Sequence, residues 1–319
     1  MNSIRPDNHM KPSSRNVWFT LCVLLVTVTM ASPLWALINY ALNRENTHAS
    51  QIVLIPFISA ALIYINRKNI FRNVHYSVMP AALVLIPGLL MLIAGRTVGA
   101  GLGENDYLAL MAASTVFLWL GCFLLFYGTN AFRTAIFPML FLGFFIPIPS
   151  GVLNATITIL QRGSAEMAYV ILKLSGTPVL RESAYVIRMP DLVIEVAPEC
   201  SGIRSGISIL ISGLLAGHLF LRTTWRRSVL VIAAIPVLIF KNALRIATLA
   251  YLAVHVDHRI LTSELHREGG IPFFILGLLL LYPVLAVLIK SENKNSGIAQ
   301  QPSVALKPAA VPGTESRRF

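Results

Sequence analysis

Long apolar stretches alternate with short polar stretches, many of them positively charged, over most of the chain. The apolar stretches are continuous and hold few charges, in contrast to the strict alternation of a half-buried strand. A run of about 18 or more such residues can cross the roughly 30 Å hydrocarbon layer of a bilayer as a helix. The pattern therefore predicts membrane-spanning helices, because a helix satisfies its own backbone polar groups where lipid cannot.

Eight spans are predicted from the apolar runs and the charges that end them. They lie at about residues 17–40, 50–66, 76–95, 107–129, 134–149, 201–221, 228–248 and 269–289. The fifth is short and contains Pro147 and Pro149, so a full span and a re-entrant segment both fit it. An N-terminal arm of residues 1–16 and a polar tail of residues 290–319, predicted to be disordered, flank a membrane domain of residues 17–289.

The segment of residues 150–199, between the fifth and sixth spans, has a different pattern. Its first half mixes apolar residues with polar and charged ones, namely Gln161, Arg162, Glu166 and Lys173. This mixture favours an amphipathic helix at the membrane surface. The second half carries β-branched residues on both sides of Met189-Pro190-Asp191, which is typical of a β-hairpin. The predicted fold is an all-α polytopic membrane protein with this small amphipathic-helix and β-hairpin insertion.

Composition and charge agree with a membrane protein and orient it. Hydrophobic residues make up 55% of the chain and charged residues 13%, which is atypical of a soluble domain. With eight spans, both termini lie on one face, together with 15 of the 26 Lys and Arg residues but three of the 14 acidic residues. The positive-inside rule places that face in the cytoplasm and the insertion outside, which predicts a multi-pass protein of the cell (inner or plasma) membrane. The net charge of +12 then reflects topology and not nucleic-acid binding.

The three cysteines differ in their predicted surroundings. Their number and spacing fit neither a disulfide framework nor a zinc site, and nothing in the sequence indicates a metal or organic cofactor. Cys22 and Cys122 fall inside apolar spans and are interpreted as ordinary buried residues. Cys200 lies where the sixth span begins, and a helix N-terminus favours the thiolate form of cysteine. Cys200 is therefore the candidate nucleophile.

Arg245 and His266 are predicted to reach the same membrane face as Cys200. A thiolate can attack a peptide carbonyl, an imidazole can carry protons, and a fixed cation can stabilise a developing oxyanion. Cys200, Arg245 and His266 are therefore the predicted catalytic residues of an acyl-transfer enzyme. His255 and His258 are alternative proton carriers. The structural alternative is an arginine that reaches the headgroups and a solvated loop histidine.

Three neighbouring residues are candidates for supporting or substrate-binding roles. Arg204 lies four residues after Cys200, so a continuous helix would put both on one face, although Arg204 also fits a pair with Glu199 or a lipid phosphate. Asn242 lies three residues before Arg245, a spacing suited to orienting Arg245, to binding a substrate backbone or to packing between helices. Ser201 is a candidate helix cap.

Four motifs, in this order, closely resemble those of the exosortase/archaeosortase family: FPMLFLGFFIPIP, GTPVLRE followed by LVIEVAPECSGIRS, KNALRI and LHREGG. The resemblance covers about residues 107–289. It implies a multispan membrane transpeptidase in which Cys200, Arg245 and His266 match the family's proposed catalytic residues. The implied partners are exported proteins with a C-terminal sorting signal of the PEP-CTERM kind, which combines a short Pro-containing motif, a transmembrane helix and a basic cluster. The implied reaction cleaves near that motif, forms a thioester and passes the protein to a cell-surface acceptor, often in connection with exopolysaccharide production.

Two other functions fit the sequence. A membrane transporter or channel would use Lys241, Arg245 and Arg204 to line a path for an anion, and it would function without Cys200. A non-catalytic assembly partner for polysaccharide export would tolerate Cys200→Ala. Membrane lipid is a partner under each of these interpretations.

Overall fold

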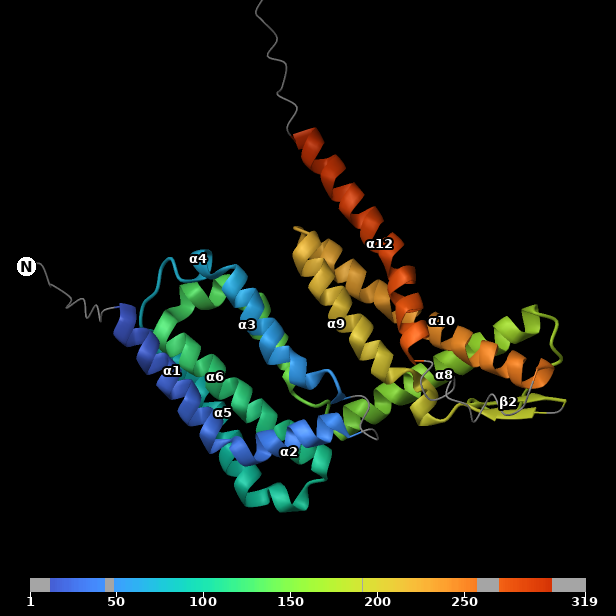
Figure 1. The fold of residues 1–319 in the computed structure, drawn as a ribbon, viewed down its shortest axis with the longest axis horizontal. Coiled ribbons are helices and arrows are strands. Elements are labelled where there is room, and N and C mark those ends of the chain that lie inside the picture. The colour runs from blue at the N-terminus through green and yellow to red at the C-terminus, as the bar shows by residue number, and fades with distance from the viewer. Residues whose placement is uncertain (1–11, 44–48, 191, 257–269, 300–319) are drawn as a thin grey trace, which may run out of the picture.

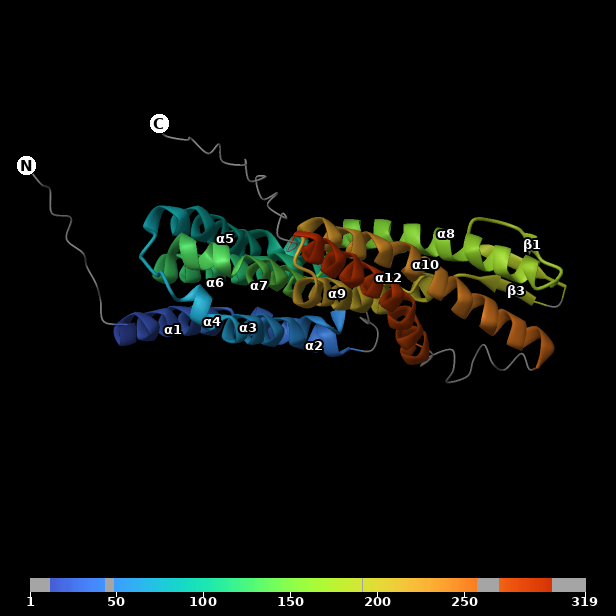
Figure 2. The ribbon, with the colours of Figure 1, turned by 90° about the horizontal axis from the view of Figure 1, so that it is seen from above.

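The structure, a computed structural model, describes residues 12–43, 49–190, 192–256 and 270–299. The molecule is elongated and mostly helical, with α1 to α7 gathered at one end and α8 to α12 at the other (Figures 1 and 2). The helices of the first half are α1 (Pro12–Thr29), α2 (Ala31–Leu42), η2 (Ile52–Leu54), α3 (Ile55–Ile65), α4 (Arg67–Ile70), α5 (Val78–Val98), η3 (Gly99–Gly101), α6 (Glu104–Thr134), α7 (Ile136–Phe141) and η4 (Leu142–Phe145). Those of the second half are α8 (Ser150–Leu174), η5 (Pro198–Ser201), α9 (Ile203–Phe220), α10 (Thr224–His255) and α12 (Gly270–Ala299).

Five helices in the described part of the chain are long and apolar enough to cross a membrane. They are Val78–Gly101, Glu104–Thr134, Ile203–Phe220, Thr224–His255 and Pro272–Lys294. Two bent helix pairs raise the number to seven, namely Ser14–Thr29 with Ala31–Leu42 at 69° and Ile136–Phe145 with Ser150–Leu174 at 89°. The segment expected to span at 50–66 forms a shorter apolar helix, Ile52–Ile65. The described residues thus support a polytopic membrane protein with five to seven candidate spans where the sequence predicted eight.

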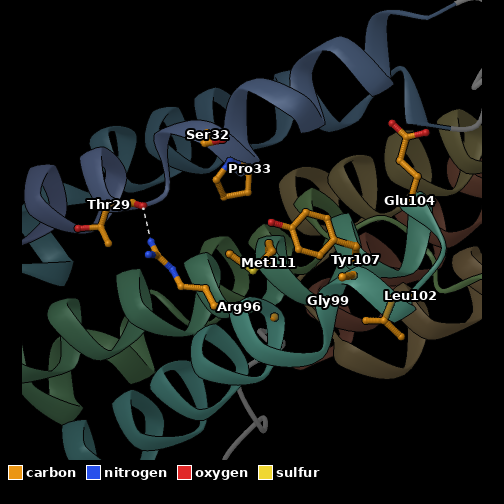
Figure 3. A pocket seen from close by; sticks show the side chains of 11 residues that line it. Thr29, Ser32, Pro33, Arg96, Gly99, Leu102, Glu104, Tyr107 and Met111 are labelled. Carbon is orange, nitrogen blue, oxygen red and sulfur yellow. Dashed lines mark hydrogen bonds between the residues drawn. The ribbon is translucent and has the colours of Figure 1, made fainter.

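The first predicted span is not one straight helix, because the chain bends between α1 and α2. Pro33 has no backbone N–H, so it cannot donate the helical hydrogen bond to the carbonyl of Thr29 four residues earlier. Arg96 of α5 donates to that carbonyl at 3.3 Å instead, as Figure 3 shows. The bend borders a cavity of about 810 Å³ that is also lined by η3 and the start of α6. A contact between helices thus replaces the bond that the proline removes.

Helices α5 and α6 form the most extensive helix pair of the first half. A Cβ atom on Gly121 would lie 2.5 Å from the side chain of Leu85, so glycine allows the two backbones to approach this closely. The hydroxyl of Ser114 donates to the carbonyl of Gly88 at 2.8 Å across the same contact. Close packing through small residues is typical of membrane helices.

Helix α8 packs against α10 rather than lying alone at a surface. Its small residues Ala165 and Ala168 belong to a buried cluster with Ala243 and Ala247 of α10. Its charged residues contact the neighbouring sheet, where Arg162 donates to the hydroxyl of Tyr185 at 2.9 Å. The helix mixes apolar and polar residues, as its sequence predicts, and protein covers its face of small residues and part of its polar face, while Ile159 and Leu174 stay exposed.

A three-stranded antiparallel sheet follows α8, where the sequence predicted a two-stranded hairpin. Its strands β1 (Leu180–Arg181), β2 (Val186–Met189) and β3 (Leu192–Glu195) have the order β1-β2-β3. β2 and β3 pair through Val186↔Glu195 and Met189↔Leu192 at their two ends. Arg188 donates two hydrogen bonds of 2.9 Å to Glu182, which lower the pKa of that carboxyl. Because this ion pair is exposed, the sheet depends mainly on its backbone ladder and on the apolar residues beneath it.

Helix α12 continues through Ala299, whereas the sequence predicted a disordered tail from residue 290. Glu292 is buried and accepts hydrogen bonds of 2.9 Å from the backbone N–H groups of Arg222 and Thr223. It also forms an ion pair with Arg226, whose guanidinium lies 3.0 Å away. The polar sequence just after residue 290 therefore takes part in the packed structure, because the Glu292 carboxylate binds the two residues that precede α10.

Glu292→Ala is expected to lower the melting temperature of the protein by several degrees. The substitution leaves the buried Arg226 guanidinium without its carboxylate and removes the acceptor of the Arg222 and Thr223 N–H groups. Thermal unfolding of the purified protein in detergent measures the effect. Lys294→Ala on the same helix is the control, because Lys294 is exposed. Equal melting temperatures for the two variants would contradict a structural role for the ion pair.

Candidate functional site

Cys200 does not lie in the first turn of the sixth predicted span. It lies in η5, and Gly202 then separates η5 from α9 with a left-handed backbone at φ 77°. Glycine adopts this conformation without steric cost. A Cβ atom at Gly202 would also lie 2.7 Å from Oδ1 of Asn242. The sequence-based expectation that Cys200 lies at the N-terminus of the long helix therefore needs correction, since the Gly202 turn separates Cys200 from α9.

This break changes the roles expected of Arg204 and Ser201. Arg204 and Cys200 do not share a helical face, because the helix does not run continuously between them. Arg204 is exposed, and its carbonyl accepts a hydrogen bond of 2.9 Å from Gln51. Ser201 is 2% exposed, and its hydroxyl has no hydrogen-bond partner among the described residues. Gly202, and not Ser201, is the N-cap of α9, and no side chain caps that helix end.

Cys200 and Arg245 line one cavity of about 240 Å³. One wall consists of residues 193–197, which include the end of β3, and the other consists of Arg245, Ile246 and Leu249 of α10. Both Cys200 and Arg245 are half-buried. Electrostatic interactions are stronger in such a partly enclosed site than in water. The cavity therefore combines a thiol with a cation able to stabilise negative charge beside it.

Asn242 and helix α8 fix the backbone of the chain that carries Cys200. The Asn242 amide donates to the carbonyl of Cys200 at 2.8 Å and to the hydroxyl of Ser164 at 3.0 Å. Gln161, one turn earlier on α8, donates to the carbonyl of Val196. Asn242 is 1% exposed and Ser164 is fully buried. The segment of residues 196–200 is thus held at both ends by buried amides from two helices.

Sequence reasoning missed the roles of Gln161 and Ser164. Gln161 was read as one of the polar residues of a surface helix. A signal was present, because Gln161, Ser164, Ala165 and Ala168 recur at the three- and four-residue spacing of one helical face. Small and amide-bearing residues on one face fit a helix that packs closely against protein.

Lys241 contributes a second anchor and a second positive charge. It is 1% exposed, and its ammonium group donates to the hydroxyl of Ser205. Ser205 in turn donates to the carbonyl of Gly202 at 3.1 Å. Lys241 and Asn242 therefore hold the chain on the two sides of the Gly202 turn. Since Lys241 and Arg245 lie one helical turn apart, α10 presents two basic side chains to this region.

The proposed proton carrier His266 lies outside the described residues, as does His258. His255 is described at the end of α10, ten residues after Arg245 and therefore about 15 Å farther along the helix. Its ring stacks on Tyr251 at 4.1 Å, and its Nδ1 lies 3.0 Å from the carbonyl of Tyr251. His255 is therefore not adjacent to the cavity. In the described part of the chain, no three His, Cys, Asp or Glu side chains form a group that could hold a metal ion.

The other two cysteines lie at the opposite end of the molecule, on α1 and α6. The sulfur atoms of Cys22 and Cys122 are 2.9 Å apart. The sequence interpretation treated them as separate buried residues and gave no reason to expect this contact, because it joins positions from two distant spans. Neither residue lines the cavity of Cys200.

Asn242→Ala is expected to raise the labelling rate of Cys200 by a water-soluble maleimide about fivefold. That factor corresponds to the roughly 1 kcal/mol contributed by one hydrogen bond, here the bond that restrains the Cys200 backbone. The measurement uses a chain in which Cys22 and Cys122 are alanine, so that Cys200 is the thiol labelled. Ser164→Ala is the matched control, because it removes a partner of Asn242 but leaves the bond to Cys200. A labelling rate that Asn242→Ala does not alter would show that the amide does not restrain the thiol.

Comparison with known proteins finds a match between this chain and one protein family. A family model described as a transmembrane exosortase matches residues 42–283. The matched region contains the whole cavity of Cys200 and Arg245 and extends past His266. No curated protein and no solved structure matches the chain.

Proposed function

Since the chain belongs to the transmembrane exosortase family, we propose that it is a membrane-embedded cysteine transpeptidase that cleaves C-terminal sorting signals from exported proteins. The family implies a sorting transpeptidase and the candidate spans indicate a multi-pass membrane protein. The single observation that carries the cysteine mechanism is the cavity that Cys200 and Arg245 share. A nucleophile and an oxyanion-stabilising cation in one small cavity are what acyl transfer requires.

The proposed reaction begins when the Cys200 thiolate attacks the carbonyl carbon of the scissile peptide bond. The carbonyl oxygen becomes an oxyanion, which the Arg245 guanidinium stabilises. The tetrahedral intermediate collapses, the C–N bond breaks, and the leaving amine takes a proton from His266. A nucleophile on the acceptor, or water, then gives a proton to His266 and attacks the thioester, which restores the Cys200 thiolate.

The surrounding residues support this mechanism by position and charge. Asn242 donates to the Cys200 carbonyl, so it is proposed as a positioning residue rather than a catalytic one. Lys241 and Arg245 together favour an anion near α10. Arg204 has no role in this mechanism, because its exposed side chain does not line the cavity. The transporter alternative is less well supported, since Lys241 is engaged with Ser205 rather than lining that cavity.

The family resemblance supplies the remaining parts of the proposal. The substrates are exported proteins with PEP-CTERM-like signals, and the acceptor lies at the cell surface in a system connected with exopolysaccharide. Both termini lie in the cytoplasm, and residues 150–199 with the site lie on the outer face of the cell membrane. This orientation rests on the eight spans expected from the sequence, for which the positive-inside rule places both termini in the cytoplasm.

Co-expression with a candidate substrate tests the proposed function. A tagged secreted protein ending in a candidate sorting signal from the same genome is followed by mass, with and without the chain. We expect loss of the C-terminal signal only when the chain is present, and a covalent enzyme adduct that neutral hydroxylamine releases as expected for a thioester. Equal masses across a panel of signals would favour the transporter or assembly-partner function.

A further inference from the structure

Strand β3 forms an edge of the sheet. Among the described residues it pairs with β2 alone, because the strand order is β1-β2-β3. The N–H of Val196, just after β3, donates to the carbonyl of Tyr185 on the β2 side at 2.8 Å. Backbone groups alternate in direction along a strand, so those of Ile194 and Leu192 also point toward β2. The N–H and C=O groups of Val193 and Glu195 therefore point away from the sheet.

This edge, which pairs with no further strand among the described residues, borders the cavity that contains Cys200. Residues 193–197 form one wall of that cavity, and the chain reaches Cys200 three residues later. Val193 is 50% exposed, and Glu195 is exposed as well. Natural proteins usually protect exposed edges with proline, lysine or a bulge. The four-residue strand Leu192–Glu195 has one charged residue, Glu195, but it contains no proline or lysine and its pairing with β2 shows no bulge.

We propose that an extended segment of the substrate polypeptide adds to β3 as a further strand, which brings its scissile bond to Cys200. This inference rests on the proposed function and specifies how the substrate is held. Only an extended backbone can pair with the outward groups of Val193 and Glu195, which excludes a helical substrate segment at this position. Main-chain hydrogen bonds to β3 would fix the distance between the scissile bond and the Cys200 thiol. Substrates with different side chains could therefore bind in the same position. The side chains that reach the cavity beside Arg245 then provide selectivity.

Val193→Pro tests the edge from the enzyme side. Proline removes the outward N–H of residue 193 but leaves the bonds to β2, because that N–H does not face β2. We expect Val193→Pro to lower the rate of substrate cleavage at least about fivefold, the effect of one lost hydrogen bond. Val193→Ala is the matched control, since it shortens the same side chain and keeps the N–H, and we expect the proline variant to cleave at least about fivefold more slowly than this alanine variant. Equal rates for the proline and alanine variants would overturn the proposal.

A scan of the substrate backbone gives the second test and does not depend on how a variant folds. Synthetic peptides covering a cleaved signal carry one N-methyl group each, and the parent enzyme in detergent is assayed with every peptide. Strand pairing predicts that cleavage falls at alternate positions and persists between them, because alternate N–H groups face β3. A uniform effect, or none, would overturn the proposal.

The outcomes separate this inference from the proposed function. If the unmethylated peptide is not cleaved in a Cys200-dependent manner, the proposed function fails and the inference fails with it. If it is cleaved but neither the proline variant nor the methyl scan shows the expected pattern, only the strand pairing fails. If Val193→Pro alters the oligomeric state and leaves cleavage unchanged, the edge pairs with a second copy of this chain and the substrate proposal is overturned.

Discussion

Cys200→Ala is expected to reduce cleavage of a sorting signal by about 1,000-fold or more, to the level seen without the enzyme. The substitution removes the sulfur atom that is proposed to form the thioester, so the remaining site could position and polarise the substrate but would not form the acyl-enzyme. A factor of 1,000 corresponds to about 4 kcal/mol of transition-state stabilisation. The measurement is the mass of a tagged substrate protein recovered from cells that express each variant at equal level in the membrane.

Two controls make this result specific to the thiol of Cys200. The double variant Cys22→Ala and Cys122→Ala should retain parental cleavage, because those sulfur atoms contact each other at the other end of the molecule. Cys200→Ser preserves the size of the side chain but replaces the thiol with a much weaker nucleophile. Cleavage by Cys200→Ser at the parental rate would refute the thiolate mechanism.

Arg245→Ala is expected to lower kcat about 100- to 1,000-fold while membrane insertion is retained. The guanidinium lines the cavity with Cys200, and the loss of one oxyanion donor typically costs that much. Because Arg245 is proposed to stabilise charge that develops during attack, kcat is expected to fall more than KM rises. Steady-state cleavage of a synthetic signal peptide by purified enzyme separates the two constants.

Arg204→Ala is the matched control for the loss of a positive charge near the site. Arg204 follows Cys200 closely in sequence, but its side chain is exposed and does not line the cavity. We expect its kcat to stay within about twofold of the parent, as for most exposed substitutions. If Arg204→Ala and Arg245→Ala lowered kcat equally, the positive potential of the region would explain the effect of Arg245, and a direct contact between Arg245 and the oxyanion would not.

Much of the helical arrangement follows from hydropathy, because a membrane requires long apolar segments to be helices. The helices Val78–Gly101 and Glu104–Thr134, for example, cover the predicted spans 76–95 and 107–129. The bend at Pro33 was missed although the proline is visible in the sequence. The carbonyl of Thr29 at the bend accepts a hydrogen bond from Arg96, 67 positions later in the chain, and no local sequence pattern identifies this partner.

Around Cys200, too, the sequence predicted features that depend on local position and missed those that depend on contacts between distant segments. Cys200, Arg245 and Asn242 were singled out from their positions at predicted span ends, and the structure brings these three together. The turn at Gly202 was missed, because a glycine near a helix start fits both a continuous helix and a break. Gln161 and Ser164 were missed as anchors because their partners, the carbonyl of Val196 and the amide of Asn242, come from other elements. The strength of a buried polar contact depends on the residues that surround it in the fold, and the periodicity of the sequence does not identify those residues.

Helix α10 joins the ion pair of Arg226 and Glu292 at one end to Asn242 and Arg245 toward the other. Arg226 and Arg245 are separated by 19 residues of continuous helix, or about 28 Å. Each residue turns an α-helix by about 100°. One residue inserted between Arg226 and Asn242 would therefore rotate the side chains of both Asn242 and Arg245 away from Cys200. The ion pair at one end of α10 and the hydrogen bonds of Asn242 near the other therefore fit a single rotation of the same helix, so the register of the chain between them is part of the site.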